Sequence, residues 1–171
     1  YINYARSNST GYVNAPGVLL ANAVIFSFGG AHLELGEHYL ANEYFPNSNL
    51  QMKSDLRQDL IRYYDFLTAY QNLLRDGGTF ASFEVKSADE NIRIENWPAS
   101  QGTVAVSGKK IGGRDVIHLI NFSEANSMDW RDTNGTQKEP ATITDAEITI
   151  TVDNQVKNIW FASPDLNGGI S

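Results

Sequence analysis

The sequence contains no cysteine, so disulfides, thiolate metal sites and cysteine nucleophiles are excluded. Basic residues are also few, because 13 Lys and Arg stand against 20 Asp and Glu, for a net charge of −7. A nucleic-acid backbone is bound by clustered Lys and Arg, and here these residues are scattered, so nucleic acid is excluded as a partner. The longest apolar run, residues 18–28, is well short of the roughly 20 residues that cross a bilayer, and we predict no membrane span.

The chain has 171 residues, enough for one ordinary domain or two small ones but fewer than the about 250 residues of a complete (β/α)8 barrel. Hydrophobic residues make up 42% and charged residues 19%, which is typical of a chain with a packed core. The sequence begins with Tyr1 instead of Met, and we expect it to be part of a longer polypeptide.

Composition changes along the chain. All eight tyrosines lie within residues 1–70, and all three tryptophans follow residue 76. The sequence Asp76-Gly77-Gly78 lies at this change, and glycine readily takes the left-handed conformation that ends a helix. We therefore predict two domains, residues 1–76 and residues 77–171.

A strongly amphipathic helix is predicted at residues 54–75. Its apolar side chains recur at spacings of three and four, as expected for a helix with one face on a core. Ser54 is the predicted N-cap, and the carboxylate of Asp55 suits the positive end of the helix dipole.

A second helix is predicted at residues 18–28. Asn14 is its expected N-cap, Pro16 belongs to the first turn and Gly29-Gly30 ends the helix. Because this helix is apolar nearly all round, we expect it to be buried on more than one side.

Strands are predicted on both sides of this helix, at residues 1–4 and 31–36. Strand, helix and strand in this order make part of a parallel α/β unit. The second domain instead predicts an antiparallel β-sandwich, because β-branched and aromatic segments alternate with turn residues. Its main predicted strands are residues 103–107, 114–121, 143–152 and 156–163.

The histidine and the tryptophans of the second domain are predicted to be structural. His118 lies in an apolar strand, and we expect it to face solvent or to be a hydrogen-bonded core residue. Trp97, Trp130 and Trp160 are expected in the core or at an interface, with a sugar-stacking platform as the alternative.

The first domain holds one segment dense in chemically active side chains, residues 32–47. It contains three carboxylates, two imidazoles, two tyrosines and two amides. Such residues commonly line a substrate site at the C-terminal ends of barrel strands. Carboxylates and amides pair with sugar hydroxyls and aromatic rings stack on sugar faces, so the pattern favours a sugar-binding site.

Three other interpretations of this segment stay open. His32, Glu34 and His38 could bind a metal, although their spacing differs from the His-Glu-x-x-His zinc motif. Glu34 and Glu37 could form the carboxylate pair of a glycosidase, which needs a separation of about 5 to 9 Å that sequence proximity does not establish. The segment could also be a hydrogen-bonded loop in which His32 or Glu34 bonds to the backbone.

The longest distinctive motif is Gly29-Gly30-Ala31-His32-Leu33-Glu34-Leu35-Gly36-Glu37-His38, which continues as Asn42-Glu43-Tyr44-Phe45-Pro46-Asn47. It resembles family 66 of the glycoside hydrolases, which contains the endo-dextranases and the cycloisomaltooligosaccharide glucanotransferases. Further similar motifs lie at residues 14–20, 63–67, 116–121, 129–134 and 162–165. The resemblance therefore covers nearly the whole chain.

This resemblance implies the last part of a (β/α)8 barrel followed by an antiparallel β-sandwich of the Greek-key type. The chain would hold the end of barrel strand seven, helix seven, strand eight and helix eight, and then the sandwich. Members of the family are retaining enzymes that act on α-1,6-glucan, with an Asp nucleophile and a Glu acid/base that lie upstream of the segments matched here. The resemblance therefore assigns no catalytic residue, no cofactor and no metal site to this chain.

The resemblance does assign residues at the rim of the barrel, which would orient glucose rings by hydrogen bonds and stacking. These predicted substrate-binding residues are Asn3, Tyr4, His32, Glu34, Glu37, Asn42, Tyr44 and Asn47. The implied partners are an α-1,6-glucan, such as dextran or isomaltooligosaccharides, and the N-terminal remainder of the same enzyme. The implied location is extracellular or at the cell surface, and this segment alone would be inactive.

Two other functions stay open. The chain could be a non-catalytic glucan-binding or structural β-sandwich module, or part of a metal-dependent hydrolase that uses His32 and His38. Part of a barrel leaves strand edges and apolar surface uncovered. We therefore expect residues 1–76 to fold only against the rest of the barrel.

Overall fold

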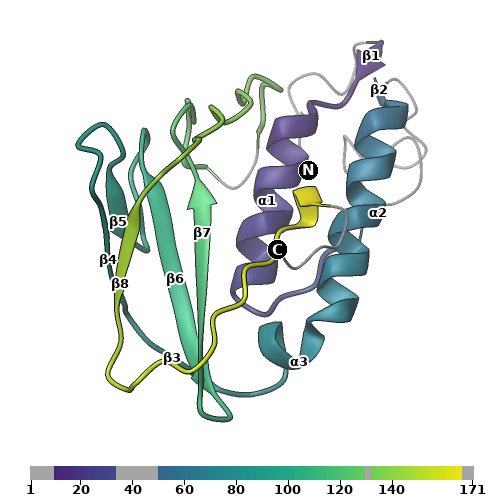
Figure 1. Cartoon of the computed structure of the whole chain (residues 1–171). Helices are drawn as coiled ribbons and strands as arrows, with labels where there is room; N and C mark the ends of the chain where they lie inside the picture. The colour runs from purple at the N-terminus through teal and green to yellow at the C-terminus, as the bar shows by residue number, and fades with distance from the viewer. Residues whose placement is uncertain (1–9, 34–49, 130–131, 167–171) are drawn as a thin grey trace.

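The computed structural model of the chain describes residues 10–33, 50–129 and 132–166. Two long helices lie on one side of the molecule and the longest strands on the other (Figure 1). The elements in chain order are β1 (Gly11–Tyr12), α1 (Ala15–Ser27), β2 (Leu50–Gln51), α2 (Ser54–Ala69), α3 (Gln71–Leu74), β3 (Thr79–Phe80), β4 (Glu84–Ser87), β5 (Ile94–Asn96), β6 (Val104–Ile111), β7 (Arg114–Asn121), β8 (Ile148–Thr151) and the 3-10 helix η2 (Pro164–Leu166).

Helix α1 starts and ends close to the predicted residues. Pro16 lies in its first turn, and the helix stops at Ser27, just before the two glycines. Asn14 occupies the N-cap position, but its side chain makes no capping hydrogen bond. Its amide nitrogen instead donates to Asp132 Oδ2 at 2.6 Å and to the Gln137 carbonyl oxygen at 2.8 Å. The predicted capping bond is therefore wrong, because a loop of the β-rich part binds the amide.

The predicted helix at residues 54–75 is divided into α2 and α3. Tyr70 separates them with φ −110° and ψ 16°, outside the helical range. The N-cap residue is Lys53, so Ser54 is the first helical residue and not the cap that the sequence predicts. Asp55 lies in the first turn, as predicted, and its Oδ1 accepts from the Leu56 amide at 2.8 Å.

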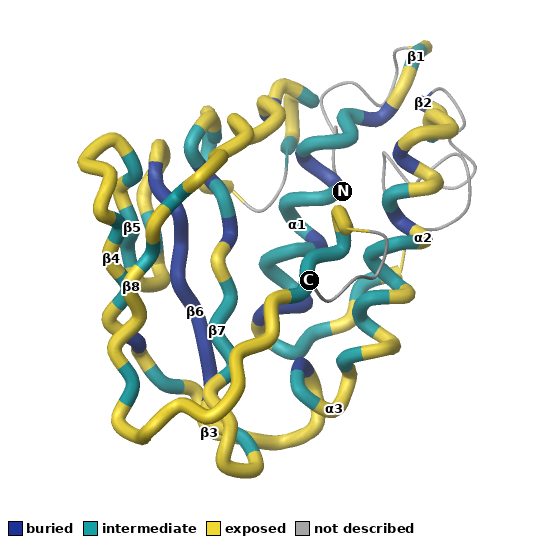
Figure 2. Tube along the Cα trace, viewed as in Figure 1, coloured by how far each residue is buried: buried dark blue, intermediate teal, exposed yellow. Residues whose placement is uncertain are grey.

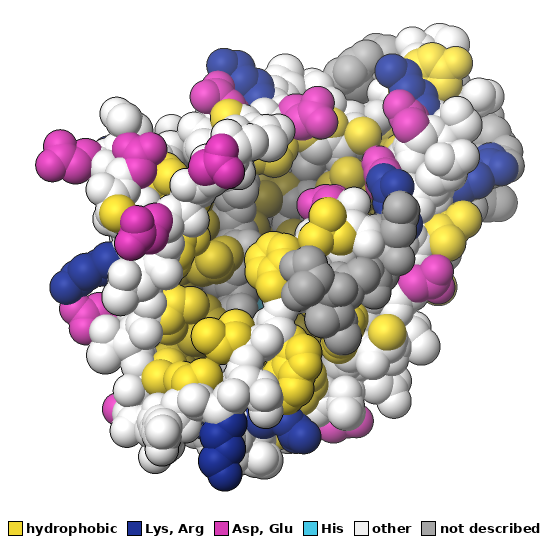
Figure 3. All heavy atoms as spheres, in the orientation of Figure 1, with side chains coloured by type: hydrophobic (Ala, Val, Ile, Leu, Met, Phe, Trp, Pro, Cys, Tyr) yellow, Lys and Arg dark blue, Asp and Glu magenta, His cyan; other side chains and the backbone are white. Residues whose placement is uncertain are grey.

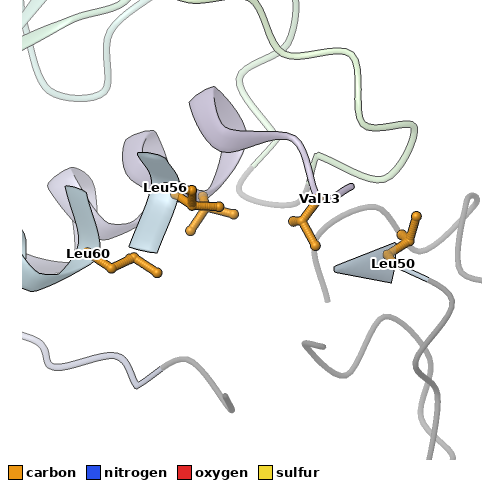
Figure 4. Packing of buried hydrophobic residues seen from close by; sticks show 5 residues of the cluster. Val13, Leu50, Leu56 and Leu60 are labelled. Carbon is orange, nitrogen blue, oxygen red and sulfur yellow. The ribbon is translucent and has the colours of Figure 1, made fainter. Parts of the chain in front are cut away.

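Helix α1 is buried on two sides, which confirms the prediction from its apolar sequence. Toward α2, Val18 packs in a cluster with Leu56, Leu60, Leu50 on β2 and Val13 just after β1 (Figure 4). Figure 2 shows buried residues on both helices.

The opposite side of α1 packs on the sheet. Leu20, Ala23 and Val24 contact a second buried cluster. That cluster consists of Ala105 on β6, Ile120 on β7 and Phe122 just after β7. One helix therefore joins both parts of the molecule.

A parallel α/β pairing is present, but not at the predicted residues. β1 and β2 pair in parallel, with Gly11 opposite Leu50 and Tyr12 opposite Gln51. Within the predicted strand at residues 31–36, the described residues 31–33 have no strand structure, and the remainder lies outside the described ranges, as does the predicted strand at residues 1–4.

The β-rich part contains two small sheets. β6 is the centre of the first: β7 pairs along one edge, and β3 and β5 pair along the other. Because β5 is parallel to β6, this sheet is mixed and not purely antiparallel. β4 and β8 form a separate antiparallel pair. The described residues contain no closed barrel.

The strand predictions hold best at the β6–β7 ribbon. β7 covers the predicted residues, and β6 extends beyond its predicted end to Ile111. The turn between them is Gly112-Gly113, with φ of 55° and 73°, values that glycine takes without strain. This Gly-Gly turn was not predicted from the sequence.

The strand predictions fail toward the C-terminus. Of residues 143–152, only β8 is a strand, and Asp145 interrupts the segment with φ 54°. Of residues 156–163, only Ala162 makes a bridge, and residues 156–161 are exposed. Extended apolar residues form a strand only when another strand takes up their backbone groups.

Two of the tryptophans can be compared with their predicted structural role. Trp97 packs between Phe28 and Phe122, at ring-centroid distances of 5.3 and 6.2 Å, so it lies at the contact between α1 and the sheet, as predicted. Trp160 is 65% exposed, which contradicts the predicted burial. Trp130 lies outside the described residues.

Candidate functional site

Most of the predicted substrate-binding residues fall where the structure is not described. These are Asn3, Tyr4, Glu34, Glu37, Asn42, Tyr44 and Asn47. Their assignment stays a prediction. His32 is the member of the set that the structure places.

His32 lies a few residues after the end of α1 and turns back toward that helix. Its Nδ1 lies 2.8 Å from Oδ1 of Asn22, so Nδ1 carries the hydrogen and donates. Asn22 is fully buried within α1, and a buried amide in an otherwise apolar helix requires such a partner. The bond fixes the orientation of the imidazole, and the substrate-binding role of His32 stays a prediction.

The metal-site alternative cannot be built from the described part of the chain. Within it, no group of three or more His, Asp or Glu side chains is placed to hold a metal ion. Glu34 and His38, the other two members of the alternative site, lie outside the described residues. No helix within the same ranges is both long and apolar enough to cross a membrane.

A hollow lies where β1 and β2 lead into the helices. Two residues separate β1 from α1, and two separate β2 from α2. Because the two strands are parallel, their carboxyl ends and the first turns of α1 and α2 lie at the same end of the molecule (Figure 1). In α/β proteins ligands bind at this end of parallel strands. The hollow has a volume of about 370 Å³ and is lined by Tyr12, Gln51, Met52, Lys53, Ser54 and Asp55.

The side chains around this hollow combine an aromatic ring with polar groups. The Tyr12 side chain is exposed, and Lys53 Nζ lies 5.3 Å from its ring centroid. Gln51 supplies an amide and Asp55 a carboxylate. In Figure 3 charged and apolar side chains adjoin one another at this corner of the molecule. The hollow can therefore offer a stacking surface together with hydrogen-bond donors and acceptors.

The backbone beneath the hollow is firmly held. The Val13 amide donates to the Gln51 carbonyl oxygen at 3.0 Å, which extends the parallel pairing by one bond. Val13 and Leu50 are buried in the cluster beside α2. Tyr12 and Gln51, which neighbour these two residues along the chain, thus project from an anchored strand pair.

Sequence reasoning did not find this hollow. Its residues come from two stretches separated by the segment at 32–47, and each strand is two residues long. The predicted start of the helix at Ser54 was the feature of the sequence that could have indicated the hollow. The residues just before a helix in an α/β unit lie at the end of the sheet where such proteins bind their ligands.

His118 is a largely buried titratable group of the β-rich part. It pairs across β6 and β7 with Ser107, on the sheet face that packs on α1. Burial first, and the charge of Lys109 second, lower the pKa of His118 to about 4. Its Nε2 and the Ser107 hydroxyl are buried without a hydrogen-bond partner among the described residues. This contradicts the prediction that His118 faces solvent or is a hydrogen-bonded core histidine.

The fold comprises an α/β segment, with a hollow at the carboxyl ends of its parallel strands, joined to a β-rich part. The chain belongs to glycosyl hydrolase family 66, whose sequence profile matches residues 1–171. This confirms the resemblance seen in the sequence.

Curated relatives agree with this assignment. A cycloisomaltooligosaccharide glucanotransferase of Niallia circulans is 34% identical in an alignment of 162 residues that covers 89% of this chain and 16% of the relative. A dextranase of Streptococcus salivarius is 29% identical in an alignment of 138 residues that covers 72% of this chain and 16% of the relative. The chain thus spans about a sixth of the length of the curated relatives it matches.

A solved structure shows the same arrangement of the chain. It is a cycloisomaltooligosaccharide glucanotransferase of Paenibacillus sp. in complex with cycloisomaltoheptaose. The match has a TM-score of 0.81 at 28% identity and covers 95% of this chain and 23% of that chain.

Proposed function

We propose that this chain is the C-terminal part of a retaining glycoside hydrolase that degrades or cyclises α-1,6-glucan. The observation that carries the proposal is the family match over residues 1–171, with relatives named as a glucanotransferase and a dextranase. In this proposal the catalytic Asp and Glu belong to the rest of the enzyme, and this chain contributes to substrate binding.

The structure supports the need for further barrel sectors. β1 and β2 form a sheet of two strands within the described residues. Parallel sheets are found in proteins with both faces covered and with several strands, and an isolated pair is marginal in water. We propose that the missing strands are those of a (β/α)8 barrel and that the β-rich part completes a sandwich beside it.

The proposed role of the chain is to orient glucose units at the barrel rim. Carboxylate, amide and imidazole groups bind sugar hydroxyls, and tyrosine rings stack on sugar faces. Correct orientation of the scissile linkage lowers the barrier without any group of this chain reacting. The residues proposed for this role are Asn3, Tyr4, His32, Glu34, Glu37, Asn42, Tyr44 and Asn47.

We also propose that the enzyme acts outside the cell or at its surface. Dextran is a polymer that does not cross a lipid bilayer unaided, so its degradation begins where the polymer is. Detection of the enzyme with an antibody in culture medium, cell-surface and cytoplasmic fractions tests this proposal.

Reassembly tests the proposed activity. The chain is co-expressed with the N-terminal portion of the Niallia circulans relative, ending where this chain's match begins, and the purified complex is incubated with dextran. We expect sugar release from the complex and none from either piece alone. New reducing ends indicate hydrolysis, whereas cyclic products without new reducing ends indicate cyclisation.

The opposite result would point to the non-catalytic alternative. If the chain alone is a soluble monomer that unfolds cooperatively and binds dextran, and the complex has no activity, the chain is a binding module and the enzyme proposal is wrong. His32→Ala in the complex tests the rim role, with Lys86→Ala on the exposed β4 as the matched control.

A further inference from the structure

We infer that the hollow beside Tyr12 is a binding subsite for one glucose unit of the α-1,6-glucan, with the Tyr12 ring as its stacking surface. This inference rests on the proposed function, because it names a subsite for the same substrate. Tyr12, Gln51 and Lys53 carry it, and none of them is among the eight residues predicted from the sequence.

The place and size of the hollow are the first argument. It lies beside the carboxyl ends of a parallel strand pair, where α/β proteins bind their ligands. Its volume is about 370 Å³, and it is a shallow hollow that opens to solvent. An open hollow of this size suits a single ring of a polymer whose neighbouring units stay in solvent.

The chemistry of the lining is the second argument. The Tyr12 side chain is 51% exposed, so part of its ring is open to a ligand. A pyranose presents C–H groups on its face and hydroxyls around its edge, and an aromatic ring bordered by polar groups complements both. Lys53 can donate to a hydroxyl oxygen, and the Gln51 amide can donate and accept.

The charges around the hollow favour a neutral ligand. Lys53 and Asp55 both line it, so the positive charge of one is opposed by the negative charge of the other. A phosphate or carboxylate ligand would meet the Asp55 carboxylate at close range, which disfavours anions. A sugar carries no charge and can bond to both groups.

Rigidity is the third argument. The strand pair is bonded from Gly11 to Val13, and Val13, Leu50 and Leu56 bury its underside (Figure 4). A stacking ring held on an anchored backbone loses little freedom when a ligand binds. The strand pair therefore sets the position of Tyr12, and a sugar would stack on the ring face opposite the one over which Lys53 Nζ lies.

Tyr12→Ala and Tyr12→Phe in the reassembled enzyme test the inference. Tyr12→Ala is expected to raise the KM for dextran by about two- to tenfold, the range for loss of one aromatic stacking contact. The kcat is expected to stay unchanged, because a subsite away from the reacting bond supplies uniform binding. Tyr12→Phe keeps the ring and is expected to behave as the parent.

Ile61→Ala is the matched control. Ile61 is a large exposed side chain on α2, outside the lining of the hollow. Retardation of each variant in a native gel that contains dextran gives a second reading that needs no turnover. Thermal unfolding of each variant shows whether the fold is kept.

The outcomes separate the two proposals. If the unsubstituted complex acts on dextran, and Tyr12→Ala and Ile61→Ala have the same KM and the same retardation in the gel, the subsite inference is overturned while the enzyme proposal stands. If the parent has no activity but its retardation depends on Tyr12, the subsite stands and the enzyme proposal fails. If the parent neither acts on dextran nor is retarded by it, both fail.

Discussion

The helices contact one another and the sheets through different kinds of interface. Between α1 and α2 the buried contacts are aliphatic around Val18, Leu56 and Leu60, and the ring of Phe26 packs against two tyrosine rings of α2. Between the helical and β-rich parts, apolar contacts are accompanied by hydrogen bonds that reach far along the chain. Apolar burial is not directional, whereas hydrogen bonds are. Both interfaces bury apolar side chains, and the hydrogen bonds of the second also fix how the two parts sit against each other.

Two polar contacts mark the ends of the second interface. Asp132 lies against the first turn of α1, where it accepts from Asn14. A side chain at position 17 would place its Cβ 2.6 Å from Asp132 Oδ2, so the close approach requires Gly17. At the other end, buried Lys109 donates from Nζ to the Leu74 carbonyl oxygen at 2.6 Å and to that of Gly77 at 3.2 Å.

Leu56→Ala should give the largest effect, because it opens a cavity in the aliphatic interface. Leu56 is fully buried, and such a substitution costs about 2–5 kcal/mol. Amide hydrogen exchange of α2 in the reassembled enzyme measures this loss. Ile61→Ala on the same helix is the control, and equal losses in both variants would show that the interface is not the source of the stability.

Acid should weaken the sheet side of α1 through His118. Burial lowers the pKa of His118 from 6.5 to about 4, so the unfolded chain binds a proton that the folded chain does not between these pH values. The contribution of neutral His118 to the free energy of unfolding is therefore fully present above pH 6.5. It falls as the pH drops toward 4, by about 1.4 kcal/mol per pH unit and on the order of 3 kcal/mol in total.

The pH dependence is read from amide exchange of β6 and β7, corrected for the intrinsic effect of pH on exchange. Carboxylates titrate in part of the same range, so the comparison is with His118→Leu. The free energy of unfolding of the parent should fall relative to that of His118→Leu as the pH falls from 6.5 to 4. An identical pH profile in both would show that His118 keeps its ordinary pKa in the fold.

Lys109→Met should have a smaller effect, located at the second interface. It leaves the Leu74 and Gly77 carbonyl oxygens without the ammonium that they share, and loss of a hydrogen bond to a charged group costs about 1.5–3 kcal/mol. Exchange is expected to rise in α3 and in β6. The neighbouring Lys110→Met is the control, because Lys110 is exposed and exposed ion pairs contribute about 0–1 kcal/mol.

The parts of the fold that depend on nearby residues could be predicted from the sequence. The periodicity of residues 54–75 and the glycines after residue 28 located both long helices, because helix hydrogen bonds and ends are local. The break at Tyr70 was not visible, since the helical pattern continues through it. The β-branched and apolar residues of 114–121 located β7, because such side chains favour a strand that packs on one face.

Features that join distant residues could not be predicted. The β1–β2 pair joins two short stretches on either side of the segment at 32–47, and nothing local indicates that Tyr12 lies beside Gln51. Asn22 is an isolated amide in an apolar helix, and its pairing with His32 became visible only in the fold. The predicted strand at residues 156–163 shows the converse, because a strand pattern does not by itself provide a partner strand.

Asn14 should give the smallest effect, and it decides what the start of α1 depends on. Asn14→Ala removes the bonds to Asp132 and Gln137 and should cost about 1 kcal/mol, as for a typical hydrogen bond. Asn14→Asp distinguishes the two roles of this residue, because aspartate is a good N-cap but would set its carboxylate against that of Asp132. We expect Asn14→Asp to be at least as destabilising as Asn14→Ala at neutral pH. Parent-like amide exchange of α1 in Asn14→Asp would instead show that Asn14 acts as a helix cap, and that the second interface does not depend on this bond.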